Sequence, residues 1–453
     1  MNNRTQSNFN YKLGISKIQI DSFQYYWTRI EFELNEMDPL TWLSSQTTYP
    51  RMYWSSRDTN LEIACLNEIF AIHKLPSLIQ SSFIKGDIKP QIKLFGIHPF
   101  NKKILEKNSS KSWESFHQTY FFLPEFEIIK NESRTFWAFN KLAVQPEKLN
   151  LKKINKLVKD ISVKHSESYE VMNSIEKVTY SPRFEVWCNQ VESILEKINF
   201  HGLEKVVIAR QKIITFTQSI NPLLILKLLK KHTPNTYNFA IAFDSNSTFI
   251  GLSPERLYKR DQVSIETEAI AGTRPRGISN KEDMQLSFNL LKSAKDLKEI
   301  DIVYQYIKEK LNNLCEKVDS KNRYSLIQTH NVQHLYTRLN GNLQRKYTDK
   351  EIIKVLHPTP AICGIPVIEA LNNIDKYETF NRGGYGSPIG WIGENSAYLS
   401  IAIRSALIKN RKMIIFAGCG IVQGSNSLEE WNETENKMSQ FNQILSIYGI
   451  GEA

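Results

Sequence analysis

Acidic and basic residues near the end of the chain are spaced to share one face of a helix. Glu430, Glu433 and Lys437 stand three and four residues apart, and residues at these spacings are neighbours on a helix surface. On spacing alone, the alternative is a solvent-exposed ion-pair face. A glycine-containing strand predicted at residues 414–421 argues against it, because a helix that starts after such a turn often points toward a ligand. Two carboxylates, with water and substrate oxygens, would suit Mg²⁺.

A second candidate for chemistry is a lysine at the start of an apolar run. Lys205 precedes Val206-Val207-Ile208-Ala209, and this run is typical of a buried strand. Most lysines in such positions extend their charged end to the surface. A lysine that stays in a partly dry site loses its proton more readily and can act as a base.

A third candidate is the carboxyl group in Ser253-Pro254-Glu255. These residues have the order of a helix start, with a capping hydroxyl, a first-turn proline and an acid near the positive end of the helix dipole. We therefore expect a helix after residue 253, which by itself explains all three residues. A proton donor at Glu255 would need a raised pKa, whereas a helix start lowers the pKa of a carboxyl group.

The segment from Thr267 to Gly277 reads as a strand that runs into a turn at Gly272-Thr273. Such a turn can offer backbone N–H groups and a hydroxyl to an anion. The alternative is an ordinary exit from a strand into a loop.

The elements that must position these residues form a mixed pattern. Helices are expected at 148–177, 184–198 and 281–314, and strands at 205–210, 237–243, 248–251 and 414–421. Hairpin-like strand pairs among long helices predict a mixed α+β sheet architecture rather than a parallel doubly wound one. The N-terminal third is aromatic and strand-rich. The junction at 148–177 is polar but lacks glycine, so it does not resemble a flexible linker.

Composition narrows the class of protein. Apolar residues make up 41% and charged residues 23% of the 453 residues, which argues against a disordered or fibrous protein. No apolar run of about 18 residues is present, so we expect no membrane-spanning helix. The N-terminal residues lack the apolar core of a secretory signal. Five widely spaced cysteines without a C-x-x-C pair favour a reducing cytoplasm.

A net charge of +11 has two interpretations. One is a lysine-rich surface that keeps the protein soluble, and the other is an anionic partner such as a nucleic acid. The basic residues form no dense block, and no recognised nucleic-acid-binding motif is present. We therefore expect no nucleic-acid partner.

Short motifs follow one another along the chain in a fixed order. They are 205–210, 249–255, 267–277, 295–299, 334–337, 357–366, 382–391, 403–406 and 417–437. In this order they closely resemble the chorismate-utilising enzymes, and within them the isochorismate synthases. The resemblance is dense from about residue 176 to 440. It implies an α+β fold of two stacked, mostly antiparallel sheets flanked by helices, like that of anthranilate synthase component I. Residues 1–175 would be a strand-rich part of the same domain, and 176–450 the catalytic part.

The resemblance also implies a reaction and its catalytic residues. Water would add at C2 of chorismate, the double bonds would shift and the C4 hydroxyl would leave as isochorismate forms. By motif matching, Lys205 would be the base for water and Glu255 the acid for the leaving hydroxyl. Glu299 and Glu433 would bind Mg²⁺ directly, and Glu430 would act through water.

The same resemblance implies a set of substrate-binding residues. They are Gly272, Thr273, His334, Tyr385, Arg404, Gly418, Gly420 and Lys437. Tyr385 and Arg404 match residues that hold the enolpyruvyl carboxylate, while Gly272 and Thr273 would border the ring carboxylate. One departure is Ile300, where the family usually has a histidine after the metal-binding glutamate.

Other chorismate-utilising enzymes are the rival functions. Anthranilate and aminodeoxychorismate synthases take ammonia from a glutaminase partner. Lys205, Thr267-Glu268-Ala269 and Pro358-Thr359-Pro360-Ala361 resemble the water-using branch instead, so no glutaminase subunit is expected. Salicylate synthase stays open, because it forms isochorismate and then eliminates pyruvate. Menaquinone biosynthesis is the preferred pathway, with siderophore biosynthesis as the alternative, and the oligomeric state is open.

Overall fold

The computed structural model describes residues 11–34, 37–101, 113, 116, 118–147, 150, 154, 156, 174–329 and 332–447. Its helices are α1 (Pro39–Ser44), α4 (Phe184–Phe200), α5 (Pro222–His232), α6 (Asn280–Lys292), α7 (Ala294–Asn312), α8 (Asp349–Leu356), α9 (Val367–Tyr377) and α10 (Ser427–Ile447).

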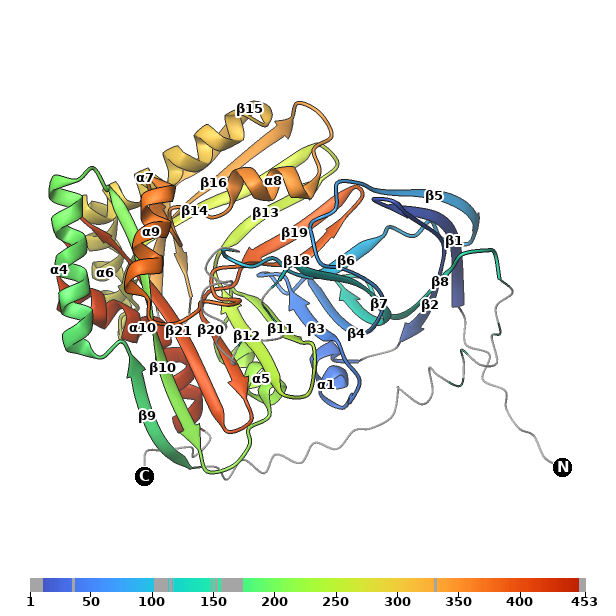
Figure 1. Cartoon of the computed structure of the whole chain (residues 1–453), viewed down its shortest axis with the longest axis horizontal. Coiled ribbons are helices and arrows are strands. Elements are labelled where there is room, and N and C mark those ends of the chain that lie inside the picture. Colours follow the sequence, from blue (N-terminus) through green and yellow to red (C-terminus); the bar gives the residue numbers. More distant parts are fainter. Residues whose placement is uncertain are drawn as a thin grey trace.

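Strands outweigh helices in this structure (Figure 1). Those before residue 182 are β1 (Tyr11–Ile20), β2 (Phe23–Leu34), β3 (Arg51–Ser55), β4 (Leu61–Ile72), β5 (Ile79–Gly86), β6 (Lys93–Ile97), β7 (Tyr120–Asn131), β8 (Thr135–Ala143) and β9 (Ile175–Ser181). Those after it are β10 (Lys205–Phe216), β11 (Tyr237–Ala242), β12 (Ser247–Ser253), β13 (Arg256–Asp261), β14 (Ser264–Pro275), β15 (Cys315–Gln328), β16 (Val332–Leu343), β17 (Gly364–Ile365), β18 (Pro388–Gly393), β19 (Ser396–Ile401), β20 (Ser405–Lys409) and β21 (Lys412–Val422).

Antiparallel ladders join these strands into one continuous, curled sheet. One arm runs in the order β9, β10, β21, β20, β12, β11, β3, β4 and β7. A second arm leaves β7 and runs through β6, β18, β19, β13, β14, β16 and β15. A branch through β8, β2, β1 and β5 extends the N-terminal end. The predicted α+β class with mostly antiparallel pairing is therefore confirmed.

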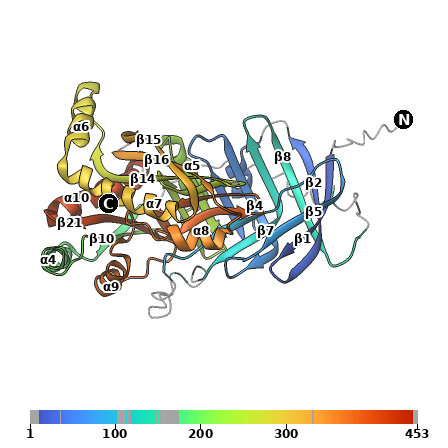
Figure 2. The same ribbon diagram turned by 90° about the horizontal axis from the view of Figure 1, so that it is seen from above.

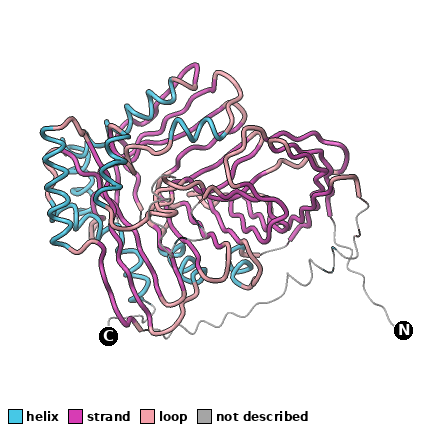
Figure 3. Tube along the Cα trace, in the orientation of Figure 1, coloured by secondary structure: helices cyan, strands magenta, loops and turns pink. Residues whose placement is uncertain are grey.

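The helices gather around the strands of the two arms, whereas the N-terminal end of the molecule consists almost entirely of strands (Figure 3). Helices α6 and α7 pack on β14, and α9 packs on β10, while α10 packs on β21. Viewed from above, β1, β2, β5, β7 and β8 form a curved wall at the other end of the molecule (Figure 2). N-terminal strands pair directly with later ones, since β3 lies beside β11 and β6 beside β18.

Local sequence explains the elements that carry the site. Strand β10 is buried along Lys205–Gln211 because it pairs with β21 on one side and with β17 and β9 on the other. Helix α10 buries Met438, Phe441 and Leu445, whose spacing of three and four residues forms one apolar stripe. The predicted strand at 205–210, the hairpin of β11 and β12, and the helix at 184–198 are confirmed.

Two predicted helices need correction, and a third is tested only at its end. No helix starts after Ser253, because the chain re-enters the sheet at Arg256, which pairs with Ser400 of β19. The long helix predicted at 281–314 is two helices, because the Ser293 side chain caps a new helix by accepting from Asp296 N–H. The segment 148–177 lies mostly outside the described residues, and its end is the start of strand β9. None of the described helices is both long and apolar enough to cross a membrane.

Candidate active site

A cavity lies between the two arms of the sheet, where α7 and α10 close its side. The space between its walls is about 640 Å³ with the open mouth included, of which about 70 Å³ can be reached by the centre of a water-sized molecule. The residues that were predicted as site residues from the sequence and that line it are Lys205, Glu255, Gly272, Thr273, Glu299, His334, Tyr385, Arg404, Gly418, Gly420, Glu433 and Lys437. The fold thus brings together all predicted site residues at the cavity except Glu430, which does not line it.

Lys205 stands at one end of the cavity with its side chain buried. It is 1% exposed, because the start of β10 lies between β21 and β17. Its Nζ donates to Glu299 Oε1 at 2.9 Å. Gly420 on β21 makes room for this pair, since a Cβ there would lie 2.6 Å from Lys205 Cε and 2.7 Å from Glu299 Oε1.

Gly420→Ala is therefore expected to separate Lys205 from Glu299 and to lower kcat about tenfold or more, with a folded protein. The added methyl group must displace one of the two side chains, and small misplacements of catalytic groups have large effects on rate. Steady-state kinetics with circular dichroism measure the effect. The comparison is Gly424→Ala, where a Cβ meets nothing within 4 Å but a φ of 86° makes the backbone strained for alanine. It shows the effect of backbone strain without a clash at Lys205 and Glu299. Wild-type kcat in Gly420→Ala would contradict the need for this close approach.

Glu255 occupies the short connection between β12 and β13 and is 4% exposed. Burial raises its pKa, and the charge of Glu268 raises it further. Lys205, Lys437 and Arg57 act in the opposite direction, and the resulting pKa is about 8. The carboxyl group is therefore protonated at neutral pH, as a proton donor requires. The conflict with a helix start disappears, since no helix begins here.

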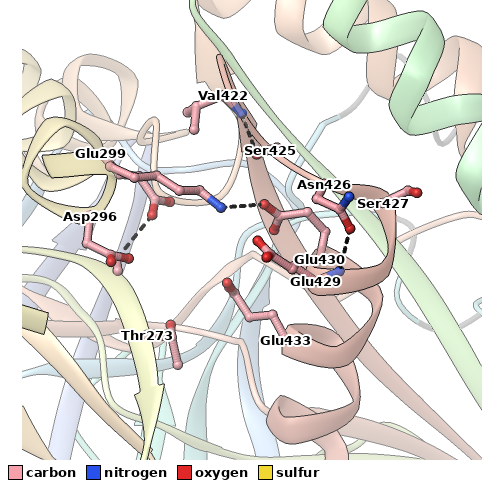
Figure 4. Close-up of polar contacts among 12 residues, drawn as sticks. Thr273, Asp296, Glu299, Val422, Ser425, Asn426, Ser427, Glu429, Glu430 and Glu433 are labelled. Carbon is pink, nitrogen blue, oxygen red and sulfur yellow. Dashed lines mark hydrogen bonds and ion pairs between the residues drawn. The ribbon is translucent and has the colours of Figure 1, made fainter. Parts of the chain in front are cut away.

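One wall of the site carries three glutamates, each beside a lysine, and is called the acidic wall below. The pairs are Glu299 with Lys205, Glu430 with Lys295 and Glu433 with Lys437. In Figure 4, Glu299 on α7 faces Glu430 and Glu433 on α10. Lys295 Nζ donates to Glu430 Oε1 at 2.9 Å, and Lys437 Nζ donates to Glu433 Oε1 at 2.5 Å.

The pairing decides the charge of these acids. Burial raises the pKa of Glu299, but Lys205, Lys437 and Lys295 together lower it below its usual value. Burial and the neighbouring Glu433 raise the pKa of Glu430 despite Lys295. Within the described part of the chain, no three acidic, histidine or cysteine side chains are already gathered as a metal centre. The acids are thus spread along the wall, each held by a lysine.

The opposite wall is a chain of hydrogen bonds that ends in an arginine. Arg404 Nη2 donates to His334 Nε2 at 3.2 Å, and His334 Nδ1 lies 3.1 Å from Thr273 Oγ1 and 3.3 Å from Gly272 O. These partners assign the proton of His334 to Nδ1. Burial and the charge of Arg404 lower the pKa of His334 well below its usual value, so the ring is neutral.

Arg404 is a buried cation without a matching anion. Burial lowers its pKa to about 10, which still leaves it charged at neutral pH. None of the described carboxylates lies within ion-pairing distance of its guanidinium. Its φ of 51° is rare for a residue with a side chain, and such strain is concentrated at functional sites. The geometry therefore leaves a guanidinium at the cavity wall that is free to pair with an anionic ligand.

Tyr385 completes the same end of the cavity. Its ring stacks on Phe416 with centroids 5.7 Å apart, and burial raises its pKa, so the hydroxyl stays neutral. A Cβ at Gly418 would lie 3.0 Å from the Tyr385 hydroxyl. The Gly418 carbonyl accepts from Lys437 Nζ at 2.9 Å. The glycine thus permits tyrosine and lysine to approach β21 together.

Comparison with known proteins decides the family. A sequence profile described as chorismate binding enzyme matches residues 17–446. The chain belongs to the chorismate-binding enzyme family. Isochorismate synthase 2 of Arabidopsis thaliana chloroplasts is 42% identical over 57% of this chain, which spans 46% of that relative. Isochorismate synthase MenF of Haemophilus influenzae is 31% identical over 94% of each chain. The solved menaquinone-specific isochorismate synthase of Escherichia coli has the same fold, with a TM-score of 0.78 at 24% identity over 96% of each chain.

Several charged residues of this chorismate-binding enzyme were not predicted as site residues. Glu268 and Lys295 lie within motifs 267–277 and 295–299, so the motifs themselves could have identified both residues as site residues. The sequence gives no indication of a role for Arg57, because its partner Glu268 lies 211 positions away in the sequence. Ile300, where the family usually has histidine, is fully buried in the core. It packs behind Glu299 and offers no polar group to the site.

Proposed function

We propose that the protein is an isochorismate synthase, which isomerises chorismate to isochorismate. The observation that carries this proposal is a protonated Glu255 and a buried Lys205 on one cavity that also holds the unpaired Arg404 guanidinium. Chorismate is a dicarboxylate, and its isomerisation exchanges one ring hydroxyl for another. This reaction requires an acid, a base and a cation that binds a carboxylate. Relatives named isochorismate synthase, at 31% identity over nearly full length, support it.

The reaction removes one proton from the attacking water and delivers one proton to the leaving hydroxyl. Lys205 takes a proton from the water that adds at C2, and Glu255 gives its proton to the C4 hydroxyl, which leaves as water while the double bonds shift. Net charge is conserved, since Lys205 gains one proton from the attacking water and Glu255 loses one to the leaving hydroxyl. Each such step contributes on the order of 10²- to 10⁴-fold to the rate.

Each carboxylate of chorismate has its own partner in this proposal. Arg404, with its planar fork of donors, and the Tyr385 hydroxyl hold the enolpyruvyl carboxylate. Gly272 and Thr273 border the ring carboxylate, with the neutral His334 beside them. Burial of these groups strengthens every charge-assisted hydrogen bond they make.

The acidic wall suits Mg²⁺ in its chemistry. Glu299 and Glu433 offer carboxylate oxygens from facing helices, and Glu430 lies behind them for contact through water. A bound Mg²⁺ would offset the charge of the ring carboxylate and orient the ring.

Product analysis tests the function directly. Purified protein, chorismate and Mg²⁺ are incubated, and products are identified by NMR while pyruvate is measured by coupled reduction. We expect isochorismate in equilibrium with chorismate and no pyruvate. Release of pyruvate would indicate salicylate synthase, and formation of an aminated ring with ammonium would indicate the ammonia-using branch. Unchanged chorismate would contradict the proposal.

Metal removal is expected to abolish activity reversibly. Glu299→Gln and Glu433→Gln should each lose Mg²⁺ binding in calorimetry, because the amide carries no charge for the cation. The matched control is Glu429→Gln, an exposed glutamate of the same helix, which should bind Mg²⁺ as the wild type does. Full turnover in metal-stripped protein, or unchanged calorimetric binding in both variants, would contradict the assignment.

Pathway and organisation are further parts of the proposal. The relatives named MenF favour menaquinone biosynthesis, while one relative of Bacillus subtilis named DhbC keeps siderophore supply as the alternative. Pairing of β3 with β11 and of β6 with β18 supports residues 1–175 and 176–450 as parts of one domain. The five free cysteines suit a reducing cytoplasm. We propose action without a glutaminase subunit.

A further inference from the structure

A second buried carboxylate lies beside Glu255 and has no role in the mechanism above. Glu268 on β14 is 1% exposed. Arg57 Nη2 donates to both of its oxygens, at 2.6 Å for Oε2, and the Arg256 N–H donates to Oε1 at 2.6 Å. Burial raises the pKa of Glu268, but Arg57 and Arg256 together lower it below its usual value. Glu268 is thus ionised, whereas its neighbour Glu255 is protonated.

The partners of Glu268 are themselves fixed. Arg57 lies in the turn between β3 and β4, and its guanidinium lies over the Tyr237 ring, 5.0 Å from the centroid. It donates to the Tyr237 hydroxyl at 3.1 Å, and Arg256 Nε donates to the same hydroxyl at 3.0 Å. The carboxylate therefore has one defined position.

Glu268 also holds the main chain of the proposed acid. The N–H of Arg256, which it accepts, belongs to the peptide bond that directly follows Glu255. The Glu255 N–H donates to Ser253 Oγ at 3.1 Å, and the Glu255 carbonyl accepts from Ile401 N–H at 3.0 Å. The Ser253 hydroxyl also donates to the Glu255 carbonyl at 3.3 Å. Glu268 thus supplies one of four contacts that fix the backbone at Glu255.

The charges that face Glu255 come from four elements. Lys205 on β10, Lys437 on α10 and Arg57 in the β3–β4 turn are cations that favour the carboxylate form. Glu268 on β14 is the negative charge among these four and favours the protonated form. Two buried carboxyl groups whose environments push them to opposite protonation states form a recurrent acid–base arrangement.

We propose that Glu268, ionised and fixed by Arg57, is a positioning residue that keeps Glu255 in place and protonated for transfer of its proton to the leaving hydroxyl. This inference rests on the proposed role of Glu255 as the acid. Glu268 does not line the cavity, so it acts through Glu255 and not on the substrate. This role would explain why a glutamate stands in the middle of the Thr267-Glu268-Ala269 motif.

The test is the pH dependence of kcat in Glu268→Gln. Glutamine keeps one oxygen for the Arg256 N–H and Arg57, while it removes the charge and one of the two acceptors of Arg57. Because Glu255 must be protonated to act, activity falls as pH rises through its pKa. Loss of the Glu268 charge lowers that pKa, so the alkaline fall should move to lower pH by roughly one unit. Activity should recover when the pH is lowered, with little change in KM.

A readout without substrate accompanies the kinetics. Infrared spectra during a pH titration follow the protonated-carboxyl band that Glu255→Gln removes, and its midpoint should fall in Glu268→Gln. The matched control is Glu266→Gln, two residues earlier on the same strand, which also pairs with Arg256 but lies outside the cavity lining. Both its alkaline limb and its band should match the wild type. Glu268→Asp, which keeps the charge, should restore the alkaline limb.

The outcomes separate the two proposals. An active Glu255→Gln would end the role of Glu255 as the acid. An inactive Glu255→Gln combined with a wild-type alkaline limb and band midpoint in Glu268→Gln would overturn the inference about Glu268 alone. If Glu268→Gln fails to fold, the Glu268→Asp profile decides, because a displaced alkaline limb in a variant that keeps the charge also overturns it.

Discussion

Lys205→Ala is expected to lower kcat for chorismate isomerisation by about 10²- to 10⁴-fold, the usual contribution of a general base. The Nζ of Lys205 is buried at the cavity wall, 2.9 Å from Glu299 Oε1. Alanine leaves the water without a group to take its proton. Product formation followed by chromatography measures the loss, and thermal unfolding shows whether the protein stays folded after Glu299 loses its partner.

Lys205→Arg is the matched control for this variant. Arginine keeps a positive charge beside Glu299, but its guanidinium does not give up its proton in proteins. If Lys205 is the base, both variants lose activity to a similar degree. Activity restored by arginine would mean that only the charge is needed. Turnover above about a tenth of the wild-type value in Lys205→Ala would rule out base catalysis of the usual size.

The parts of the site that depend on local periodicity could be predicted from the sequence. The spacing of Glu430, Glu433 and Lys437 gives one face of a helix, and the apolar run after Lys205 gives a buried strand. Both signals lie within one element, where side-chain direction follows directly from sequence spacing. The presence of these residues in one cavity followed from the resemblance, because no local pattern says which elements meet.

The surroundings of Glu255 show why local rules failed. Ser253 has the sequence of a helix cap, and its hydroxyl does accept the Glu255 N–H at 3.1 Å. A serine makes the same local bond at a helix start and at a bend between strands. The pairing of Arg256 with Ser400, across more than a hundred residues, selects the strand. Long-range pairing of this kind overrides local propensity.

For the same reason, the raised pKa of Glu255 could not be predicted from the residues next to it in the sequence. Its value of about 8 comes from burial first and then from Glu268, a residue brought alongside by the turn between β13 and β14. Arg57, which keeps Glu268 ionised, comes from the N-terminal strands. The strand-rich N-terminal part thus supports the chemistry at the site through an ion pair that only the folded chain creates.

Arg404→Ala is expected to lower kcat/KM by about 10²-fold or more, mainly through KM and with a smaller fall in kcat. Chorismate carries two carboxylates, and a metal on the acidic wall can hold only the one on the ring. Arg404 is a buried cation that forms no ion pair with the described carboxylates, so its loss leaves the second carboxylate unpaired in a partly dry site, at a cost of about 2–5 kcal/mol. A ring that is less well placed against Lys205 adds the kcat effect.

Steady-state kinetics and Mg²⁺ calorimetry together make this prediction specific. Magnesium binding should be unchanged, because Arg404 lies across the cavity from the acidic wall. Alanine at position 404 adopts the same φ of 51°. Wild type and variant therefore have the same backbone strain, and a difference in KM comes from the side chain. Arg404→Lys keeps the charge but loses the two-pronged geometry, and it should recover only part of the KM. An unchanged KM in Arg404→Ala would mean that the side-chain carboxylate is held elsewhere. Lys437, whose Nζ already lies 2.9 Å from Gly418 O, would then be the cation that binds it.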